Sequence, residues 1–550
     1  MKNTIICSIA VLSAALLAAC TETTRIWPEE GESKAYVEVS SQKVIFDADG
    51  GNAVITVATN ADGWDYAAEG DWFTVARQDG NALLVETLIN AGAETLTGKL
   101  TVSAEKNGET VSQEVALVQR AERSVNLSAE GTANCYIART GGVYKFDASV
   151  KGNGGGDGVS DYIANYGLAI EDGAFAELLW ESRHDGDKTM SREIIDGAPI
   201  YRGGYVTFST GRSEGNAVIA VKDINGNILW SWHIWVTDFV PGLAPTVEER
   251  YDPVKTPLDK VVTNYQGVKY TFMGVNIGWC DGENITYDAR SVKVRFTQAE
   301  TGAMQVITLT QASHSVVNSD NQPYFQFGRK DPMLAGIRNA SGSTVDKGCY
   351  SDGYAFDKSG TGKVAIGVSI QHPHIFYNYG SLSPYDWCAT SYSNLWSADN
   401  TVTTANDNAV VKTIYDPSPV GYHLPSSNAF TGFTYNGSNV YGSSYFGSRF
   451  NSPYTSTTDF TDNFGWEFYC NKMTGEGSYD TAGGTIFFPA SGYRYYSTGA
   501  MHSVGSYGYF WSAVPNSTYN GRYLYFSSSS INPLNYNLRS YGFAVRPVQE

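Results

Sequence analysis

Short apolar runs, separated by Gly, Asn and Asp at intervals of about ten residues, constrain the fold of this chain more than any other feature. Between residues 35 and 121 the runs alternate apolar and polar side chains, as a strand with one buried face does. A helix would need apolar residues every three or four positions instead. The runs that predict a small β-sandwich stand at 44–46, 53–57, 83–85, 99–102 and 114–118.

A second set of apolar runs lies between residues 122 and 240 and has the same alternating character. In its last run, alternation places Trp230 and Trp232 on one face of a strand and His233 on the other. A strand histidine without acidic or histidine partners at ligand spacing is usually structural, so we interpret His233 as a core residue. The runs that predict a second β-sandwich stand at 142–146, 175–180, 205–208, 216–221 and 227–235.

The rest of the chain differs in composition. Residues 241–257 combine prolines with acidic side chains, which predicts a linker. Residues 258–550 are rich in aromatic residues, Gly, Ser and Asn, and only 426–433 and 459–472 have a helical period. The predicted fold is mostly β, in the order β-sandwich 35–121, β-sandwich 122–240, linker 241–257 and α+β domain 258–550.

The N-terminus has the pattern of a lipoprotein signal. Lys2 is followed by an apolar stretch at 4–15 and by small residues directly before Cys20, which is typical of a lipobox. The stretch is shorter than the roughly 20 apolar residues that span a bilayer. The alternative is an ordinary cleaved signal that has a cysteine there by chance. We predict a signal peptide at 1–19, lipid attachment at Cys20 and a polar tether at 20–34.

Acidic residues follow the predicted attachment site and outnumber basic residues in the whole chain. Glu22, Glu29 and Glu30 loosely resemble the segment that sends some lipoproteins to the outer face of the outer membrane. We therefore predict an outer-membrane lipoprotein facing the cell exterior, with the periplasmic face as the alternative. With 56 acidic and 38 basic residues, the chain is a poor partner for nucleic acid or anionic lipid. A glycan or protein ligand fits better, and the membrane is contacted through the lipid anchor only.

Five cysteines follow the predicted anchor, and their spacing matches neither a zinc pattern nor a dense disulfide framework. An odd number of thiols allows one or two bridges at most. His372 and His374 form a His-x-His pair, but no third ligand accompanies them, so we predict neither a metal site nor a cofactor. The five cysteines are Cys135, Cys280, Cys349, Cys388 and Cys470.

Part of the first predicted sandwich resembles a known module. The motifs that carry the resemblance stand at 63–64, 71–75, 97–102 and 118–119. Together they are similar to the BACON domain, the Bacteroidetes-associated carbohydrate-binding often N-terminal module. The resemblance implies a β-sandwich and, by the family's name, carbohydrate binding. In a sandwich of this size Trp64 and Trp72 are more often core residues than a sugar platform, so we interpret this domain as a spacer.

Ordered motifs in the C-terminal domain resemble a second family. They stand at 324–332, 416–425, 509–512 and 542–546. They are similar to the Fibrobacter succinogenes major paralogous domain, whose members look like the C-type-lectin fold. Formylglycine-generating enzymes and the variable proteins of diversity-generating retroelements share that fold. The resemblance implies an α+β, C-type-lectin-like domain over residues 258–550.

Departures from that second family bear on function. Ser418 and Pro547 stand where the family usually has cysteines, so the implied bridge is missing and its roughly 2–4 kcal/mol must come from packing. The related enzymes need cysteines near their C-terminal strands, and none follows Cys470, which argues against oxidase activity. Neither a Glu-Pro-Asn nor a Gln-Pro-Asp triplet is present to support lectin-type calcium binding.

Tyr, Ser and Asn make up 25 of the 49 residues from 493 to 541. Tyr offers a stiff amphipathic surface while Ser and Asn add adaptable hydrogen bonds, as in antibody paratopes. The alternative is a secreted β domain whose solvent-exposed face is rich in these residues but binds no ligand. The predicted ligand-binding residues are Tyr495, Tyr496, Ser506, Tyr507, Tyr509, Asn516, Tyr519, Asn520, Tyr536 and Asn537. The predicted scaffold between them is Arg494, Trp511, Arg539, Gly542 and Phe543.

These features predict a non-enzymatic recognition protein or adhesin that binds a glycan or protein through its C-terminal loops. In retroelement-diversified relatives the same segment is enriched in the same residues, and one sequence does not decide whether this chain is diversified. The alternative is a structural pilus-tip or surface-assembly subunit. A polysaccharide-processing enzyme would need paired carboxylates in a cleft, and no pair stands out in the C-terminal domain, so we predict no catalytic residue.

Overall fold

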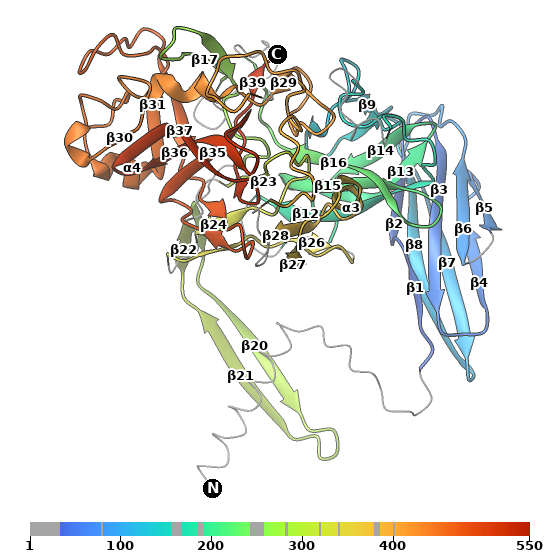
Figure 1. Ribbon diagram of the computed structural model, residues 1–550. Coiled ribbons are helices and arrows are strands. Elements are labelled where there is room, and N and C mark those ends of the chain that lie inside the picture. The colour runs from blue at the N-terminus through green and yellow to red at the C-terminus, as the bar shows by residue number, and fades with distance from the viewer. Residues whose placement is uncertain are drawn as a thin grey trace.

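The computed structural model describes most of the chain from Lys34 onward. The predicted signal peptide, Cys20 and nearly all of the predicted tether and linker lie outside the described residues. The fold is mostly β, as predicted, and β-sandwiches form its N-terminal part (Figure 1). The described residues are 34–78, 81–155, 167–184, 189, 191–242, 258–280, 284–317, 321–338, 342–351, 353–378, 386–399 and 402–550. No helix within these ranges is long and apolar enough to cross a membrane.

The first β-sandwich pairs the sheet β1-β3-β6-β5 with the strands β4-β7-β8-β2. Alternate side chains of both sheets, among them Leu83, Leu100 and Leu117, form a fully buried core. Trp64 belongs to this core and carries Arg77 over its ring, while Trp72 packs at the core edge. The strands are β1 (Val37–Val39), β2 (Lys43–Phe46), β3 (Gly51–Thr59), β4 (Trp64–Glu69), β5 (Phe73–Gln78), β6 (Ala82–Thr87), β7 (Leu96–Lys106) and β8 (Glu109–Gln119).

The second β-sandwich contains the sheet β10-β16-β15-β12 and the strands β13-β14-β11-β9. Strands β15 and β16 are buried along almost their whole length, because the sandwich core covers one face and the C-terminal domain covers the other. The strands are β9 (Val125–Asn126), β10 (Cys135–Ala138), β11 (Val143–Asp147), β12 (Phe175–Arg183), β13 (Ile195–Arg202), β14 (Tyr205–Thr210), β15 (Gly215–Lys222) and β16 (Ile228–Val236).

The two sandwiches are joined edge to edge. Strand β2 of the first pairs in parallel with β13 of the second at one position, Val44 opposite Ala198, so that eight strands form one sheet. Beside this bridge, Lys43 Nζ donates to both carboxylate oxygens of Asp196 at 2.8 Å. The apolar core of the first sandwich takes in only Ile200 from the second.

The second sandwich and the C-terminal domain share a single core. Trp230 on β16 is fully buried, and its Nε1 donates to Asn134 Oδ1 at 2.9 Å. The Asn134 amide in turn donates to the backbone oxygens of Ile414 and Asp416 at 2.7 and 2.8 Å. Lys330, also buried, donates to the backbone oxygen of Ser231 at 2.9 Å. Buried polar groups with several partners of this kind define one relative placement of the two parts.

The C-terminal domain is built from small antiparallel sheets and two-stranded ribbons. A second core of Phe and Trp side chains fills it, including Phe433, Trp466 and Phe488. Its first strands are β17 (Lys260–Thr263), β18 (Lys269–Phe272), β19 (Asn284–Tyr287), β20 (Arg290–Thr297), β21 (Met304–Gln311), β22 (His314–Val317), β23 (Phe325–Gln326), β24 (Gly336–Arg338), β25 (Thr344–Asp346), β26 (Tyr350–Ser351), β27 (Asp357–Thr361), β28 (Ile375–Asn378) and β29 (Tyr422–His423). Its last strands are β30 (Val440–Tyr441), β31 (Gly465–Tyr469), β32 (Thr485–Pro489), β33 (Tyr493–Arg494), β34 (Met501–His502), β35 (Tyr507–Pro515), β36 (Asn520–Ser527), β37 (Ser530–Leu538), β38 (Gly542–Phe543) and β39 (Val548–Gln549).

The described helices are short and confined to the C-terminal domain. They are α3 (Ile366–Gln371), α4 (Thr457–Asn463) and two 3-10 turns, η1 (Ser427–Phe433) and η2 (Ser443–Tyr445). The predicted helix at 459–472 is wrong beyond Asn463, because strand β31 follows. Ser456 and Asp459 start α4 with a reciprocal capping box, and Phe464 ends it in the left-handed region at φ 53°.

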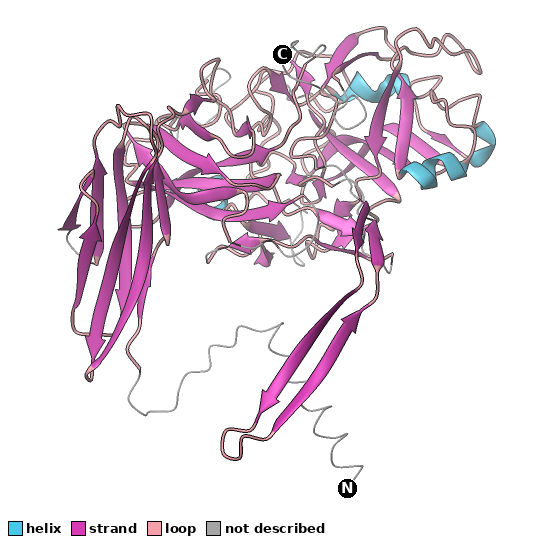
Figure 2. Cartoon of the chain, turned by 180° about the vertical axis from the view of Figure 1, so that it is seen from behind, coloured by secondary structure: helices cyan, strands magenta, loops and turns pink. Residues whose placement is uncertain are grey.

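Strands β20 and β21 form a hairpin that projects away from the body of the molecule (Figures 1 and 2). Both strands are exposed along almost their whole length. This hairpin was not predicted from the sequence.

Candidate functional site

The sheet β30-β37-β36-β35 has two chemically different faces. Phe510, Leu524, Phe526 and Ile531 point into the second core from one face. Because strand side chains alternate, the residues between them point to the opposite face. There Tyr509 lies opposite Tyr525 in the register of β35 and β36.

Tyrosines from this opposite face and from the neighbouring β33 and β38 segments gather in one place. The ring centroid of Tyr509 lies 4.7 Å from that of Tyr493 and 5.4 Å from that of Tyr525. The centroid of Tyr496 lies 4.8 Å from that of Tyr541. We call this surface the tyrosine face, and its members are Tyr441, Tyr493, Tyr495, Tyr496, Tyr507, Tyr509, Tyr523, Tyr525 and Tyr541.

Exposure increases along the tyrosine face from one end of the sheet to the other. Tyr523 is 3% exposed and packs on Phe543, whereas Tyr507 is 38% and Tyr441 74% exposed. Burial raises the pKa of the Tyr509 hydroxyl and, beside neighbouring tyrosines, that of Tyr541. These hydroxyls are therefore neutral at physiological pH and can both donate and accept hydrogen bonds.

Amide side chains border the buried end of the tyrosine face. Asn535 Nδ2 donates to the Tyr523 hydroxyl at 2.9 Å, and the Asn537 side chain also bonds that hydroxyl. At the open end, the Tyr495 hydroxyl donates to that of Tyr496 at 3.3 Å. Rings and amides together form a half-exposed surface whose parts hold one another in place.

The predicted ligand residues fall into two groups in the structure. Tyr495, Tyr496, Tyr507 and Tyr509 belong to the tyrosine face, Ser506 precedes β35 at its open end, and Asn537 borders its buried end. The remaining residues lie toward the turn between β35 and β36, and we call them the turn group: Asn516, Tyr519, Asn520 and Tyr536. Tyr536 pairs with Arg522, so it points to the opposite face from Tyr523.

The predicted scaffold residues are all buried. Arg494 donates to the backbone oxygens of Leu334 and Gly499 and to Asp346 at 2.8 Å. Burial raises the pKa of Asp346, but the Arg494 and Lys358 cations lower it further, so the net shift is downward and the ion pair stays charged. The other scaffold residues are Trp511, Gly542, Phe543 and Arg539, which lies 3.4 Å from Asp386.

Several members of the tyrosine face were missed in the sequence. Tyr523, Tyr525, Tyr541 and Tyr493 were not predicted as site residues, nor was the exposed Tyr441. The signal was a period of two: tyrosines alternate at 493 and 495, at 507 and 509, and at 523 and 525. Alternation of this kind marks the face of a strand, whereas the prediction placed these residues in loops.

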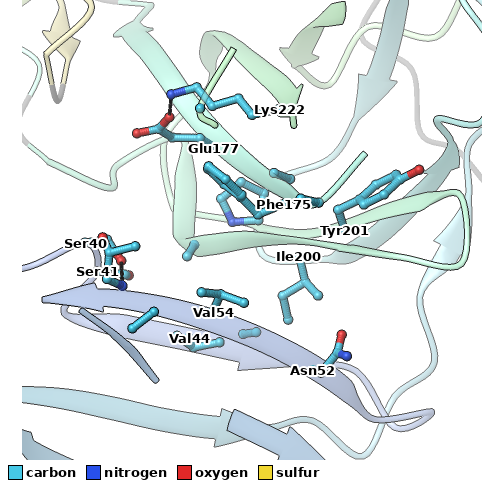
Figure 3. Close-up of a pocket in the computed structure, with 18 of the residues that line it drawn as sticks. Ser40, Ser41, Val44, Asn52, Val54, Phe175, Glu177, Ile200, Tyr201 and Lys222 are labelled. Carbon is cyan, nitrogen blue, oxygen red and sulfur yellow. Dashed lines mark hydrogen bonds and ion pairs between the residues drawn. The ribbon is translucent and has the colours of Figure 1, made fainter. Parts of the chain in front are cut away.

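A separate cavity of about 730 Å³ lies between the two sandwiches (Figure 3). Val44 of the first sandwich and Tyr201 of the second help to line it. Lys222 forms an ion pair with Glu177 and donates to the hydroxyl of Tyr354. Glu177 is the one acidic residue among the described lining, so this cavity does not present a carboxylate pair.

The described ranges contain no cluster of three or more His, Cys, Asp or Glu side chains arranged to hold a metal ion. No disulfide joins any of the five cysteines, all of which lie in the described part of the chain. Burial raises the pKa of Cys388 and of Cys470 to about 11, so both thiols are protonated and unreactive. Burial and the neighbouring His372 lower the pKa of His374 to about 4.

A family model described as a domain of unknown function, DUF8237, matches residues 467–548 and so includes most of the tyrosine face. No curated protein matches the chain. Among solved structures, titin Ig tandem domains are 10% identical over 37% of this chain and 96% of that chain, with a TM-score of 0.13. A Parabacteroides merdae β-glucuronidase is 14% identical over 37% of this chain and 24% of its own, with a TM-score of 0.14.

Proposed function

We propose that this protein is a non-enzymatic recognition protein that binds a glycan or protein ligand through the tyrosine face. The observation that carries the proposal is the gathering of tyrosine rings on the outer side of one sheet, with exposure rising to 74% at Tyr441. Monomer surfaces seldom expose contiguous aromatic area of this kind unless it contacts something.

The support beneath these rings favours binding. The inner side of the sheet is fixed by a fully buried aromatic core, including Phe510 and Phe526. Neighbouring rings and Asn535 restrict the side chains of the face itself. A ligand that docks there therefore orders few side chains, which reduces the entropic cost of binding. Neutral hydroxyls and ring faces suit the CH faces and hydroxyls of a sugar or the side chains of a protein loop.

The proposal also includes display on the cell. The lipobox at Cys20 would anchor the chain in the outer membrane, and the resemblance of the C-terminal domain to a C-type-lectin-like family fits a recognition role. Mass spectrometry of the N-terminal peptide tests lipidation. Protease shaving of intact cells separates the outer face from the periplasmic face.

The two residue groups provide a matched test of the ligand site. The chain is probed on glycan and protein arrays, and the affinity of each hit is then measured by biolayer interferometry. The triple variant Tyr495→Ala, Tyr496→Ala, Tyr507→Ala should bind at least about tenfold more weakly, since aromatic anchors dominate such interfaces. The control variant Tyr519→Ala, Tyr536→Ala, in the turn group, should bind as the parent does. Full binding by the triple variant, at an unchanged melting temperature, would refute the site.

A further inference from the structure

The projecting hairpin is regular, yet none of its residues from 290 to 311 belongs to the hydrophobic cores of the sandwiches or of the C-terminal domain. All eight residues of β20 pair with β21 without a bulge. The tip is closed by Gln298, whose backbone N–H donates to the oxygen of Ala303 at 2.9 Å. The sheet contains two strands only, among the residues described. An isolated two-stranded ribbon is marginally stable in water, so a ribbon of this length calls for a partner.

One face of the hairpin is mostly apolar, with Arg290 at its base, and the other carries Lys293 and Arg295 beside the exposed Met304 and Val306. In register, Val292 lies opposite Leu309 and Val294 opposite Ile307, so these four residues and Phe296 share a face. Leu309 and Val292 are each 59% exposed. The opposite face holds Lys293, Arg295, Thr308 and Thr310.

The two outer edges of the hairpin differ more sharply than its faces. Strand β20 carries Arg290, Lys293 and Arg295, and cations of this kind are a usual protection of an edge strand against pairing. Strand β21 reads Met-Gln-Val-Ile-Thr-Leu-Thr-Gln and contains neither a charge nor a proline. Its high β-propensity, and an outer edge from Met304 to Thr310 that pairs with no described strand, make it a template for another strand.

We propose that β21 pairs antiparallel with β21 of a second copy of this chain, so that the two hairpins form a four-stranded sheet in the order β20-β21-β21-β20. A two-fold axis then relates the copies, and the uncharged edge meets itself without like-charge contact. Both cationic β20 strands become the outer edges, which blocks further addition and closes the assembly at two copies.

The charge distribution fits a second copy. The chain carries a formal net charge of −18, whereas the two hairpin strands carry three cationic and no acidic side chains. Eight residues in a strand reach about 26 Å, well beyond the screening length of about 8 Å at physiological salt. The hairpins therefore hold the two acidic bodies far enough apart for their repulsion to be screened. The paired edge is small compared with a standard interface, so the dimer is a reversible one.

Sedimentation velocity of the secreted chain carrying Cys20→Ser, from micromolar to millimolar concentration, tests the pairing. The chain should dimerise reversibly. Thr308→Glu adds a carboxylate opposite Lys293, where it supports the hairpin itself. Thr308 lies in the middle of β21, so in the proposed pairing the two added carboxylates come close together across the two-fold axis. This variant should associate at least about tenfold more weakly, and high salt should restore part of the loss because it screens the repulsion.

Ser291→Glu is the matched control, because it adds the same charge to the same face but on β20. It should dimerise as the parent does. Replacement of residues 291–310 by Gly-Gly, which closes the hairpin at its base, should give a monomer at every concentration. A parent chain that stays monomeric would overturn the proposal, and so would an equal loss of dimer affinity in the two Glu variants. Either result overturns it even if the hairpin is then found to bind another protein or a lipid vesicle.

Discussion

The two β-sandwiches have similar architecture but opposite relations to their neighbours. Among the described residues, the core of the first consists of its own side chains with Ile200 added. Its connection to the second is one parallel bridge, the ion pairs Lys43–Asp196 and Asp49–Arg123, and hydrogen bonds from Ser124 to Asp47. The core of the second continues through Trp230 and Trp235 into side chains such as Trp511 of the C-terminal domain. The first sandwich thus has a core of its own, whereas the second shares its core with the domain that carries the tyrosine face.

The two sandwiches differ because the outer sheet face of the first is partly exposed to solvent, whereas the C-terminal domain buries that of the second. The outer face of β3 remains partly open, with Val54 37% exposed. Strands β15 and β16 are buried on both faces, as sheets covered on both sides are. A sandwich whose outer sheet face is exposed to solvent can fold as an independent unit. A sheet that is buried on both faces folds together with the domain that buries its second face. The predictions below separate these two behaviours.

The largest effect is expected at the junction of the second sandwich and the C-terminal domain. Trp230→Ala removes a fully buried ring and leaves the Asn134 acceptor unpaired, which should cost about 3–5 kcal/mol. Because the core is shared, urea denaturation followed by hydrogen exchange should show β10–β16 and the C-terminal strands destabilised together. Destabilisation of the sandwich peptides alone would contradict a common unit.

A matched change in the first sandwich should have a local effect. Leu100→Ala opens a cavity in its fully buried core and should cost about 2–5 kcal/mol. Hydrogen exchange should rise in β1–β8 while the C-terminal strands keep their protection. Increased exchange of β35–β37 in this variant would show that the first sandwich also supports the tyrosine face.

The strands of both sandwiches could be predicted from sequence, because period-two alternation reports local geometry. What alternation does not report is whether a face is covered. The runs at 216–221 and 290–297 both read as strands, yet one is buried on both faces and the other on neither. The end of helix α4 was missed because Phe464 ends it in a left-handed conformation, which bulky residues rarely adopt.

The arrangement of the proposed site residues could not be predicted from the sequence, for a related reason. Residue composition located the segment, but proximity in sequence placed Tyr507 and Tyr519 in one group. In an antiparallel pair, opposite ends of the strands are far apart: β35 runs for nine residues between them, about 30 Å. The second core, which orients the tyrosine face outward, draws on residues from Val262 to Val548 and so could not be read from any local pattern.

Acid should act on the second sandwich before the first. Burial lowers the pKa of His233 from 6.5 to about 3. Between about pH 6.5 and pH 3, His233 is therefore protonated in the unfolded state but not in the folded state. The contribution of the neutral His233 to the free energy of unfolding is fully present above about pH 6.5. It falls by about 1.4 kcal/mol per pH unit between that pH and about pH 3. Residues 35–121 contain no histidine. The urea midpoint should depend less steeply on pH between neutral pH and about pH 4 in His233→Gln than in the parent, and the remaining dependence includes that of His374. An equal pH dependence in the two proteins would exclude His233 as a cause.

The smallest effect concerns the Lys43–Asp196 ion pair, which lies beside the bridge between the two sandwiches. Lys43 and Asp196 are 39% and 25% exposed, so solvent screens their attraction and a double-mutant cycle with alanine should give a coupling of about 0.2–1 kcal/mol. Lys99, which bonds Glu69 and Glu114 within the first sandwich, is the control for loss of a surface cation. If the single bridge between β2 and β13 is the main connection, Lys43→Ala should broaden the distribution of distances between spin labels on the two sandwiches, whereas Lys99→Ala should not. An unchanged distribution of distances would mean that the continuous sheet alone fixes the orientation of one sandwich relative to the other. The first sandwich would then be a rigid extension of the second.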